Sequence, residues 1–118
     1  MNSCTILAWL DDLQMSAHLA KISTVHSYDL NFYFEGADIL KTVLPTVLIV
    51  DLGGLSEKEL LSIKDLSPSS HLTIIGYSQQ IAASQVNYFK EFGCHIVLGR
   101  NELLKNLNSI INKAFNAR

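Results

Sequence analysis

The sequence predicts an α/β fold: one domain, a flavodoxin-like doubly wound structure with a five-stranded parallel sheet and five helices. Short apolar runs alternate with helical patterns along the whole chain, residues 1–118. Successive strand–helix units joined by right-handed crossovers place helices on both faces of a parallel sheet. No linker, repeat or low-complexity tract interrupts the alternation, and 118 residues suit a single domain.

The first two predicted strands have different patterns. The run from Cys4 to Leu10 is apolar throughout, apart from Thr5, which is typical of a strand buried on both faces. From Leu30 to Phe34 apolar and polar residues alternate, so one face of this strand is wet and it lies at an edge of the sheet. Between them a helix begins at Asp12 and places three apolar residues on one stripe: Met15, Leu19 and Ile22.

The middle of the chain repeats the alternation. A short helix is predicted from near Gly36 to Val43, and Pro45 closes it. The strand that follows ends at Asp51 and is again apolar. Ser56 and Glu59 then have the spacing of a capping box, which opens a helix that continues to Leu66.

The last part of the chain adds two strands and two helices. The strands are predicted over Leu72–Tyr77 and His95–Leu98. The helix between them carries Ile81, Val86, Phe89 and Phe92, and Gly93 ends it as a residue suited to the left-handed position. The final helix starts near Asn101, and we expect it to bury Leu104, Leu107, Ile111 and Ala114.

These patterns favour the strand order 2-1-3-4-5. The first and third strands are among the most apolar and suit the centre, whereas the alternating second strand suits an edge. In this order the first and third strands are neighbours. Acids that follow them therefore meet at one edge of the sheet, where open α/β folds bind their ligands.

Composition limits the possible functions. The formal net charge is −2 and no basic stripe is present, which argues against a nucleic-acid partner. The apolar runs are too short to cross a membrane, and the N-terminus lacks a signal-peptide pattern, so we expect a cytoplasmic protein. The two cysteines, Cys4 and Cys94, have no metal-binding spacing and are expected to be free thiols.

Three aspartates carry the chemistry of the predicted edge. Asp51 closes the buried third strand, and Asp11 and Asp12 follow the buried first strand. An acid that leaves a buried strand needs a partner or a cation. Converging carboxylates suit a hard divalent cation.

With these residues in place, the chain resembles the receiver domain of two-component response regulators over nearly its whole length. The resemblance rests on the acid pair Asp11-Asp12, on the run around Asp51, on Ser78 after the fourth strand, and on the segment Gly93–Arg100 around the fifth strand. No one of these features is specific, but their order at successive strand ends is.

The resemblance implies a phosphorelay function. Asp51 would be the phosphoacceptor, and Asp11, Asp12, Asp51 and the backbone carbonyl of Gly53 would hold Mg²⁺. Ser78 and Arg100 would contact the phosphoryl group, which a histidine kinase or small phosphodonor would supply. The protein would be a signalling protein and not an enzyme. Its downstream partner would bind the face of the fourth helix, fifth strand and fifth helix.

The chain also departs from the family pattern. Arg100 stands in the position of a lysine, and Asn101 in that of the proline after it. Val97 takes the place of an aromatic switch residue, and the loop from Leu52 to Leu55 is about two residues short by comparison with the family and lacks its proline. The charged residues are mostly kept, but the output switch is altered.

Two hypotheses follow for function. In the first, Asp51 accepts a phosphoryl group with Mg²⁺ and the modified protein binds a partner. In the second, the chain is a phosphorylation-independent pseudo-receiver, an interaction module in which Arg100 pairs with Asp51 and closes the pocket. Structural roles also remain open for two residues, because Asp12 and Ser78 could each be the N-cap of the helix that follows.

Overall fold

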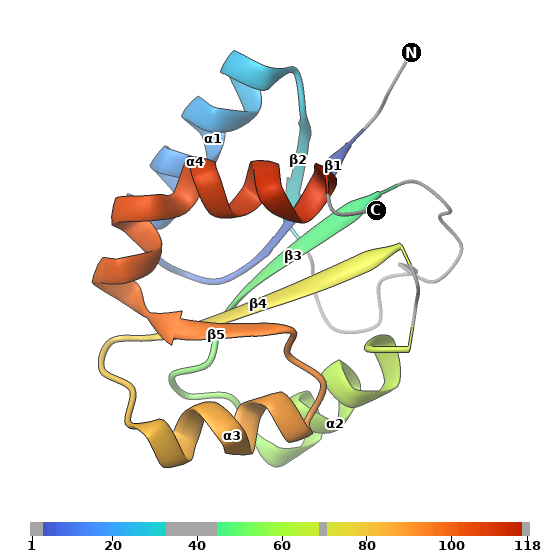
Figure 1. The fold of residues 1–118 in the computed structure, drawn as a ribbon, viewed down its shortest axis with the longest axis vertical. Coiled ribbons are helices and arrows are strands. Elements are labelled where there is room, and N and C mark those ends of the chain that lie inside the picture. The colour runs from blue at the N-terminus through green and yellow to red at the C-terminus, as the bar shows by residue number, and fades with distance from the viewer. Residues whose placement is uncertain (1–3, 33–44, 69–70, 117–118) are drawn as a thin grey trace.

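The computed structural model describes residues 4–32, 45–68 and 71–116. They form a parallel sheet with helices on both faces (Figure 1). The strands are β1 (Thr5–Trp9), β2 (Asp29–Phe32), β3 (Thr46–Asp51), β4 (Leu72–Ser78) and β5 (Ile96–Gly99). The helices within these ranges are α1 (Leu13–His26), α2 (Glu57–Leu66), α3 (Ala83–Glu91) and α4 (Arg100–Asn116).

The predicted strand order is confirmed. The sheet has the order β2-β1-β3-β4-β5, and all four neighbouring pairs are parallel. The described residues contain four of the five predicted helices. The fifth, from near Gly36 to Val43, lies outside the described residues, as do the last two residues of the predicted strand Leu30–Phe34.

Two apolar clusters cover the two faces of the sheet. The helices α1 and α4 pack on one face, and α2 and α3 pack on the other (Figure 1). β3 serves both clusters, because Val47 and Ile49 belong to the first whereas Leu48 and Val50 belong to the second. Burial on both faces explains why this strand is a continuous apolar run in the sequence.

Helices α1 and α4 bury slightly different stripes from those predicted. In α1 the buried residues are Met15, Leu19 and Ser23, and Ile22 is only partly buried. In α4 Leu103 takes the fully buried position ahead of Leu107, Ile111 and Ala114, and Leu104 is only partly buried against the same cluster. A departure from helical geometry at Asn106 accompanies this shift of the stripe.

The capping box of α2 is confirmed. Ser56 Oγ accepts a hydrogen bond from the Glu59 N–H at 3.2 Å, and Glu59 Oε1 accepts one from the Ser56 N–H at 2.9 Å. Helix α3 begins later than predicted. Its N-cap is Ala82, so Ile81 precedes the helix, and Gln85 Oε1 accepts a hydrogen bond from the Ala82 N–H at 2.9 Å.

Gly93 lets α3 and α2 come close together. Its φ of +111° is in the region that favours glycine, and a Cβ there would lie 2.4 Å from Ser67 Cβ at the end of α2. After it, His95 anchors the start of β5. The His95 N–H donates to Ile74 O, and the Ile74 N–H donates to His95 Nδ1, both at 2.9 Å.

Both cysteines are free thiols, as expected, and burial raises the pKa of Cys94 to about 12. In the described ranges no helix is both long and apolar enough to cross a membrane.

Candidate functional site

The predicted site residues gather at the carboxyl edge of the sheet. Asp11 and Asp12 follow β1, Asp51 is the last residue of β3, Ser78 is the last residue of β4, and Arg100 is the first residue of α4. Because β1, β3, β4 and β5 are neighbours in register, their ends bring these residues to one side of the molecule. The hydrogen bonds and the salt bridge among these residues show which of them are in direct contact.

Arg100 forms a salt bridge with Asp12. Its Nε donates to Asp12 Oδ2 at 2.7 Å, and its Nη2 donates to Asp12 Oδ1 at 3.1 Å, which is the two-pronged geometry that arginine makes with a carboxylate. Nη2 also donates to Gln14 Oε1 at 2.8 Å. The prediction that Arg100 pairs with Asp51 is therefore wrong, because the carboxylate nearest the start of α4 is that of Asp12.

Asp12 has two further contacts. It is the N-cap of α1, where Oδ1 accepts from the Met15 N–H at 3.1 Å, so its predicted capping role is confirmed. Its Oδ2 also accepts from the hydroxyl of Tyr77 at 3.2 Å. Arg100 is the main cause that lowers the pKa of Asp12 from 3.8 to about 2, against the opposing effect of burial.

Tyr77 joins this network without having been predicted as a site residue. It is 1% exposed, lies opposite Asp51 in the β3–β4 register, and belongs to the apolar cluster under α1 and α4. Burial, with the charges of Asp51 and Asp12, raises its pKa well above the ordinary range. A usable signal exists in the sequence, because a tyrosine inside a buried strand needs a partner for its hydroxyl.

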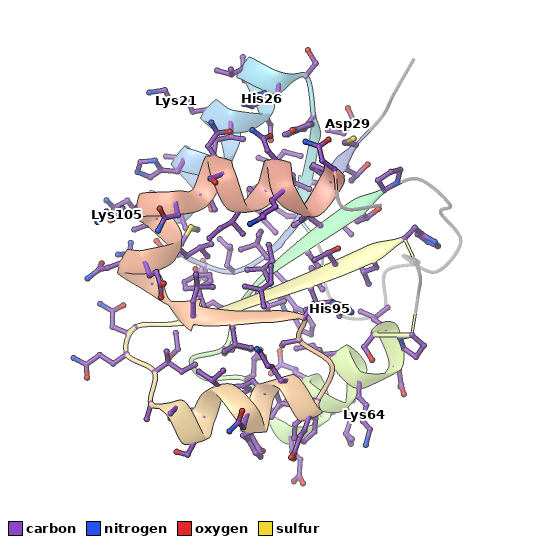
Figure 2. All side chains as sticks on the ribbon, viewed as in Figure 1. Lys21, His26, Asp29, Lys64, His95 and Lys105 are labelled. Atoms are coloured by element: carbon purple, nitrogen blue, oxygen red, sulfur yellow. The ribbon has the colours of Figure 1, made fainter. Side chains whose placement is uncertain are left out.

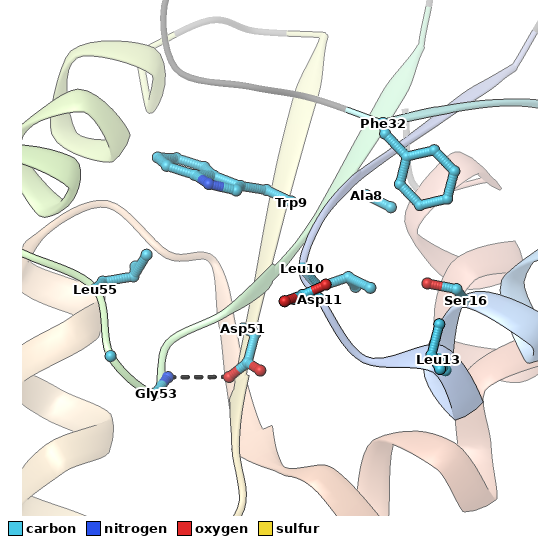
Figure 3. Close-up of a pocket in the computed structure, with 11 residues that line it drawn as sticks. Ala8, Trp9, Leu10, Asp11, Leu13, Ser16, Phe32, Asp51, Gly53 and Leu55 are labelled. Atoms are coloured by element: carbon cyan, nitrogen blue, oxygen red, sulfur yellow. Dashed lines mark hydrogen bonds between the residues drawn. The ribbon is translucent and has the colours of Figure 1, made fainter.

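Asp51 and Asp11 face a cleft of about 670 Å³ beside this network (Figure 3). Asp51 Oδ1 accepts a hydrogen bond from the Gly53 N–H at 3.0 Å, which fixes the start of the loop after β3. Asp11 is exposed at the end of β1, and its carboxylate is directed into the cleft. Asp12 is not among the residues that line this cleft.

The predicted metal ligands are therefore divided between two environments. Asp11, Asp51 and Gly53 line the cleft, whereas the Asp12 carboxylate is held by Arg100. In residues 4–32, 45–68 and 71–116 no group of three or more aspartate, glutamate, histidine or cysteine side chains is placed to hold a metal ion. As arranged, these residues do not form a single donor set for Mg²⁺, so the Mg²⁺ site predicted from the sequence would need Asp12 to be released by Arg100.

Ser78 is not a helix cap. It ends β4 and pairs in register with Gly99, while the following helix has Ala82 as its N-cap. The alternative prediction, in which Ser78 caps the helix that follows β4, is therefore wrong. Its predicted contact with a phosphoryl group remains a prediction.

No protein-family model matches the sequence, and no curated protein matches it. Three solved structures show the likeness of its fold. A response regulator from Thermotoga maritima is 8% identical with a TM-score of 0.73, and the match covers 98% of this chain and 99% of that one. An orphan response regulator of H. pylori is 12% identical, with a TM-score of 0.73 over 97% and 98% of the two chains.

A putative pilus assembly protein from Burkholderia thailandensis is 20% identical with a TM-score of 0.69, over 98% of this chain and 99% of that one. These matches span nearly the full length of both chains. At such low identity they establish architecture. The chain has the fold of response regulator receiver domains.

Proposed function

We propose that this chain is a receiver-type signal-transduction protein that acts by binding a protein partner and does not take up a phosphoryl group. The observation that carries the proposal is the salt bridge between Arg100 and Asp12. One of the three carboxylates that would hold a metal ion already has a cation, and that cation belongs to the protein itself.

The charge balance of the edge supports this proposal. A guanidinium held by two hydrogen bonds neutralises Asp12 and fixes its direction, which a divalent cation would otherwise do. The lowered pKa of Asp12 keeps its carboxylate charged at all pH values well above 2. Asp12 is therefore neutralised without a metal ion, so binding of a partner would not require one.

A buried residue of β5, Val97, supports the same conclusion. Val97 is 9% exposed and packs in the apolar cluster under α2 and α3. A short buried aliphatic side chain lacks the ring that the resemblance assigns to the switch at this position. We therefore infer that the face formed by α3, β5 and α4 is presented to a partner in one constant form.

A second candidate is phosphoryl acceptance at Asp51, from a histidine kinase or small phosphodonor. One observation favours it: Asp51, at the end of the central strand β3, lines a cleft of about 670 Å³. Metal-assisted acceptance would need Arg100 to release Asp12. The salt bridge makes this the less favoured candidate.

Incubation with phosphoramidate or acetyl phosphate and MgCl₂, followed by intact mass, distinguishes the two. We expect the wild-type protein to stay unmodified. One added phosphoryl group that disappears in Asp51→Asn would establish the second candidate and refute the first. Circular dichroism of both proteins controls for folding.

A further inference from the structure

The cleft beside Asp51 has an exposed apolar wall. Among the described residues, five large apolar side chains are exposed, and two of them, Leu13 (87%) and Phe32 (53%), line this cleft. Trp9 and Leu55 line it as well, and Figure 3 shows these side chains around the two carboxylates. Exposed apolar side chains that gather at one cleft are typical of a binding surface.

The same cleft is negatively charged. Its lining contains two aspartates, Asp11 and Asp51, and no lysine, arginine or histidine from the described part of the chain. Arg100 lies at the same edge of the sheet, but its guanidinium is engaged by Asp12 and Gln14. The cleft therefore offers two carboxylates, framed by apolar side chains, to a cation from outside.

An occupant must satisfy both features. A bare metal ion would use the carboxylates but none of the apolar wall. An arginine side chain uses both, because its guanidinium binds carboxylates through paired hydrogen bonds and stacks on aromatic rings. The volume of about 670 Å³ is in the range of sites that hold a small ligand or a few side chains.

From this charge complementarity, the geometry points to a docking site for a partner protein's segment that carries an arginine next to apolar residues. The arginine lies between Asp11 and Asp51, and its apolar neighbours cover Leu13 and Phe32. This inference rests on the proposed function and names the chemistry of the partner. It adds a second binding surface, distinct from the face of α3, β5 and α4.

The chain contains its own reporter for this site. Trp9 is the single tryptophan of the sequence and lines the cleft. The probe is the peptide acetyl-Leu-Arg-Phe-amide, titrated to millimolar concentration against the full chain while Trp9 emission is followed. The matched peptide carries citrulline in place of arginine, which keeps the shape and removes the charge.

We expect a saturable change with the arginine peptide and about tenfold weaker binding of the citrulline peptide. Asp11→Asn should weaken the arginine peptide about tenfold, because it removes one charged acceptor. Leu13→Ser should weaken both peptides. Asp29→Asn is the control, because Asp29 is an exposed aspartate at the amino end of β2, whereas the cleft lies at the carboxyl ends of the strands (Figure 2). The affinity of this variant for the arginine peptide should stay within about twofold of the wild type.

The inference is overturned by no saturable change, by equal affinity for the two peptides, or by binding that neither Asp11→Asn nor Leu13→Ser weakens. A change in Trp9 emission that follows protein concentration without peptide would mean that a second copy covers the cleft, which also overturns it. If no peptide binds and the wild type is not phosphorylated, this inference is refuted but the proposed function is not. Phosphorylation at Asp51 refutes the proposed function, whatever the peptide does.

Discussion

Arg100 and Asp12 join the first residue of α4 to the N-cap of α1 through two hydrogen bonds of 2.7 and 3.1 Å. The two residues are 88 positions apart in the sequence, and the hydroxyl of Tyr77 from β4 meets the same carboxylate. Two helices on one face of the sheet and a side chain of β4 therefore meet at one charge. This convergence fixes the edge of the sheet and separates Asp12 from the cleft that holds Asp11 and Asp51.

The salt bridge predicts how stability depends on pH. The folded pKa of Asp12 is lowered from 3.8 to about 2, so its contribution is complete above pH 3.8 and is lost as the pH falls towards 2. Both side chains of the pair are partly exposed, so we expect the contribution to be about 1 kcal/mol. Urea unfolding of the wild type and Asp12→Asn at pH values on either side of this window measures it.

Asn keeps the oxygen that caps α1, so this variant isolates the charge. The two proteins should differ in free energy of unfolding at neutral pH and converge at low pH. Asp65→Asn, at an exposed position in α2, is the matched control. A gap between wild type and Asp12→Asn that stays constant down to the acid limit would contradict the assigned role of the charge.

Tyr77→Phe tests the third contact of Asp12. The ring stays buried, but the hydroxyl that donates to Asp12 Oδ2 is removed. We expect the pKa of Asp12 to rise, while Arg100, the larger cause, keeps it below its ordinary value. Carbon-detected NMR titration of the Asp12 carboxyl measures this pKa directly.

Tyr88→Phe provides the comparison, because Tyr88 is 47% exposed on α3 and lies outside the network. This variant should leave the Asp12 titration unchanged. If Tyr77→Phe also leaves it unchanged, the hydroxyl does not act on Asp12.

Alanine substitutions at Gly54 and Gly93 distinguish the cost of a strained φ from the added cost of a steric clash. Gly54 has a φ of +86°, and a Cβ added there would meet no other described residue within 4 Å, so Gly54→Ala should cost about 1 kcal/mol of unfolding free energy. Gly93 has a φ of +111°, and a Cβ added there would clash with the side chain of Ser67, so Gly93→Ala should cost on the order of 3 kcal/mol of unfolding free energy.

Chemical denaturation of both variants measures these costs. Gly99→Ala is the control, since its Cβ would meet open space at an ordinary φ, and its cost should be near zero. Equal losses in Gly54→Ala and Gly93→Ala would show that the contact between α3 and α2 relaxes without cost.

Much of the fold could be predicted from the sequence because strand patterns report burial. The continuous apolar run of β3 and the alternation in β2 correctly placed one at the centre and the other at an edge. The start of α3 was harder, because its first turn carries no side-chain cap of the usual type. Ala82 lies at the N-cap, and Gln85 reaches back to its N–H.

The location of the site residues was predicted correctly, but the salt-bridge partner of Arg100 was not. The carboxyl edge collects Asp11, Asp12 and Asp51, as the strand order required. Which aspartate receives Arg100 depends on side-chain direction at the starts of α1 and α4, and strand periodicity carries no information on that. The N-cap geometry of Asp12 turns its carboxylate towards α4, whereas Asp51 turns to the loop at Gly53.

Calorimetric titration with MgCl₂ tests the central claim, that Arg100 serves as the cation of Asp12. The wild type should give no binding heat at millimolar Mg²⁺, and Arg100→Met should bind it, because Asp12, at the edge that also carries Asp11 and Asp51, then loses its cation. Asp12→Asn added to Arg100→Met should abolish that binding. Wild-type binding of Mg²⁺ that Asp12→Asn removes and Arg100→Met leaves unchanged would contradict the claim.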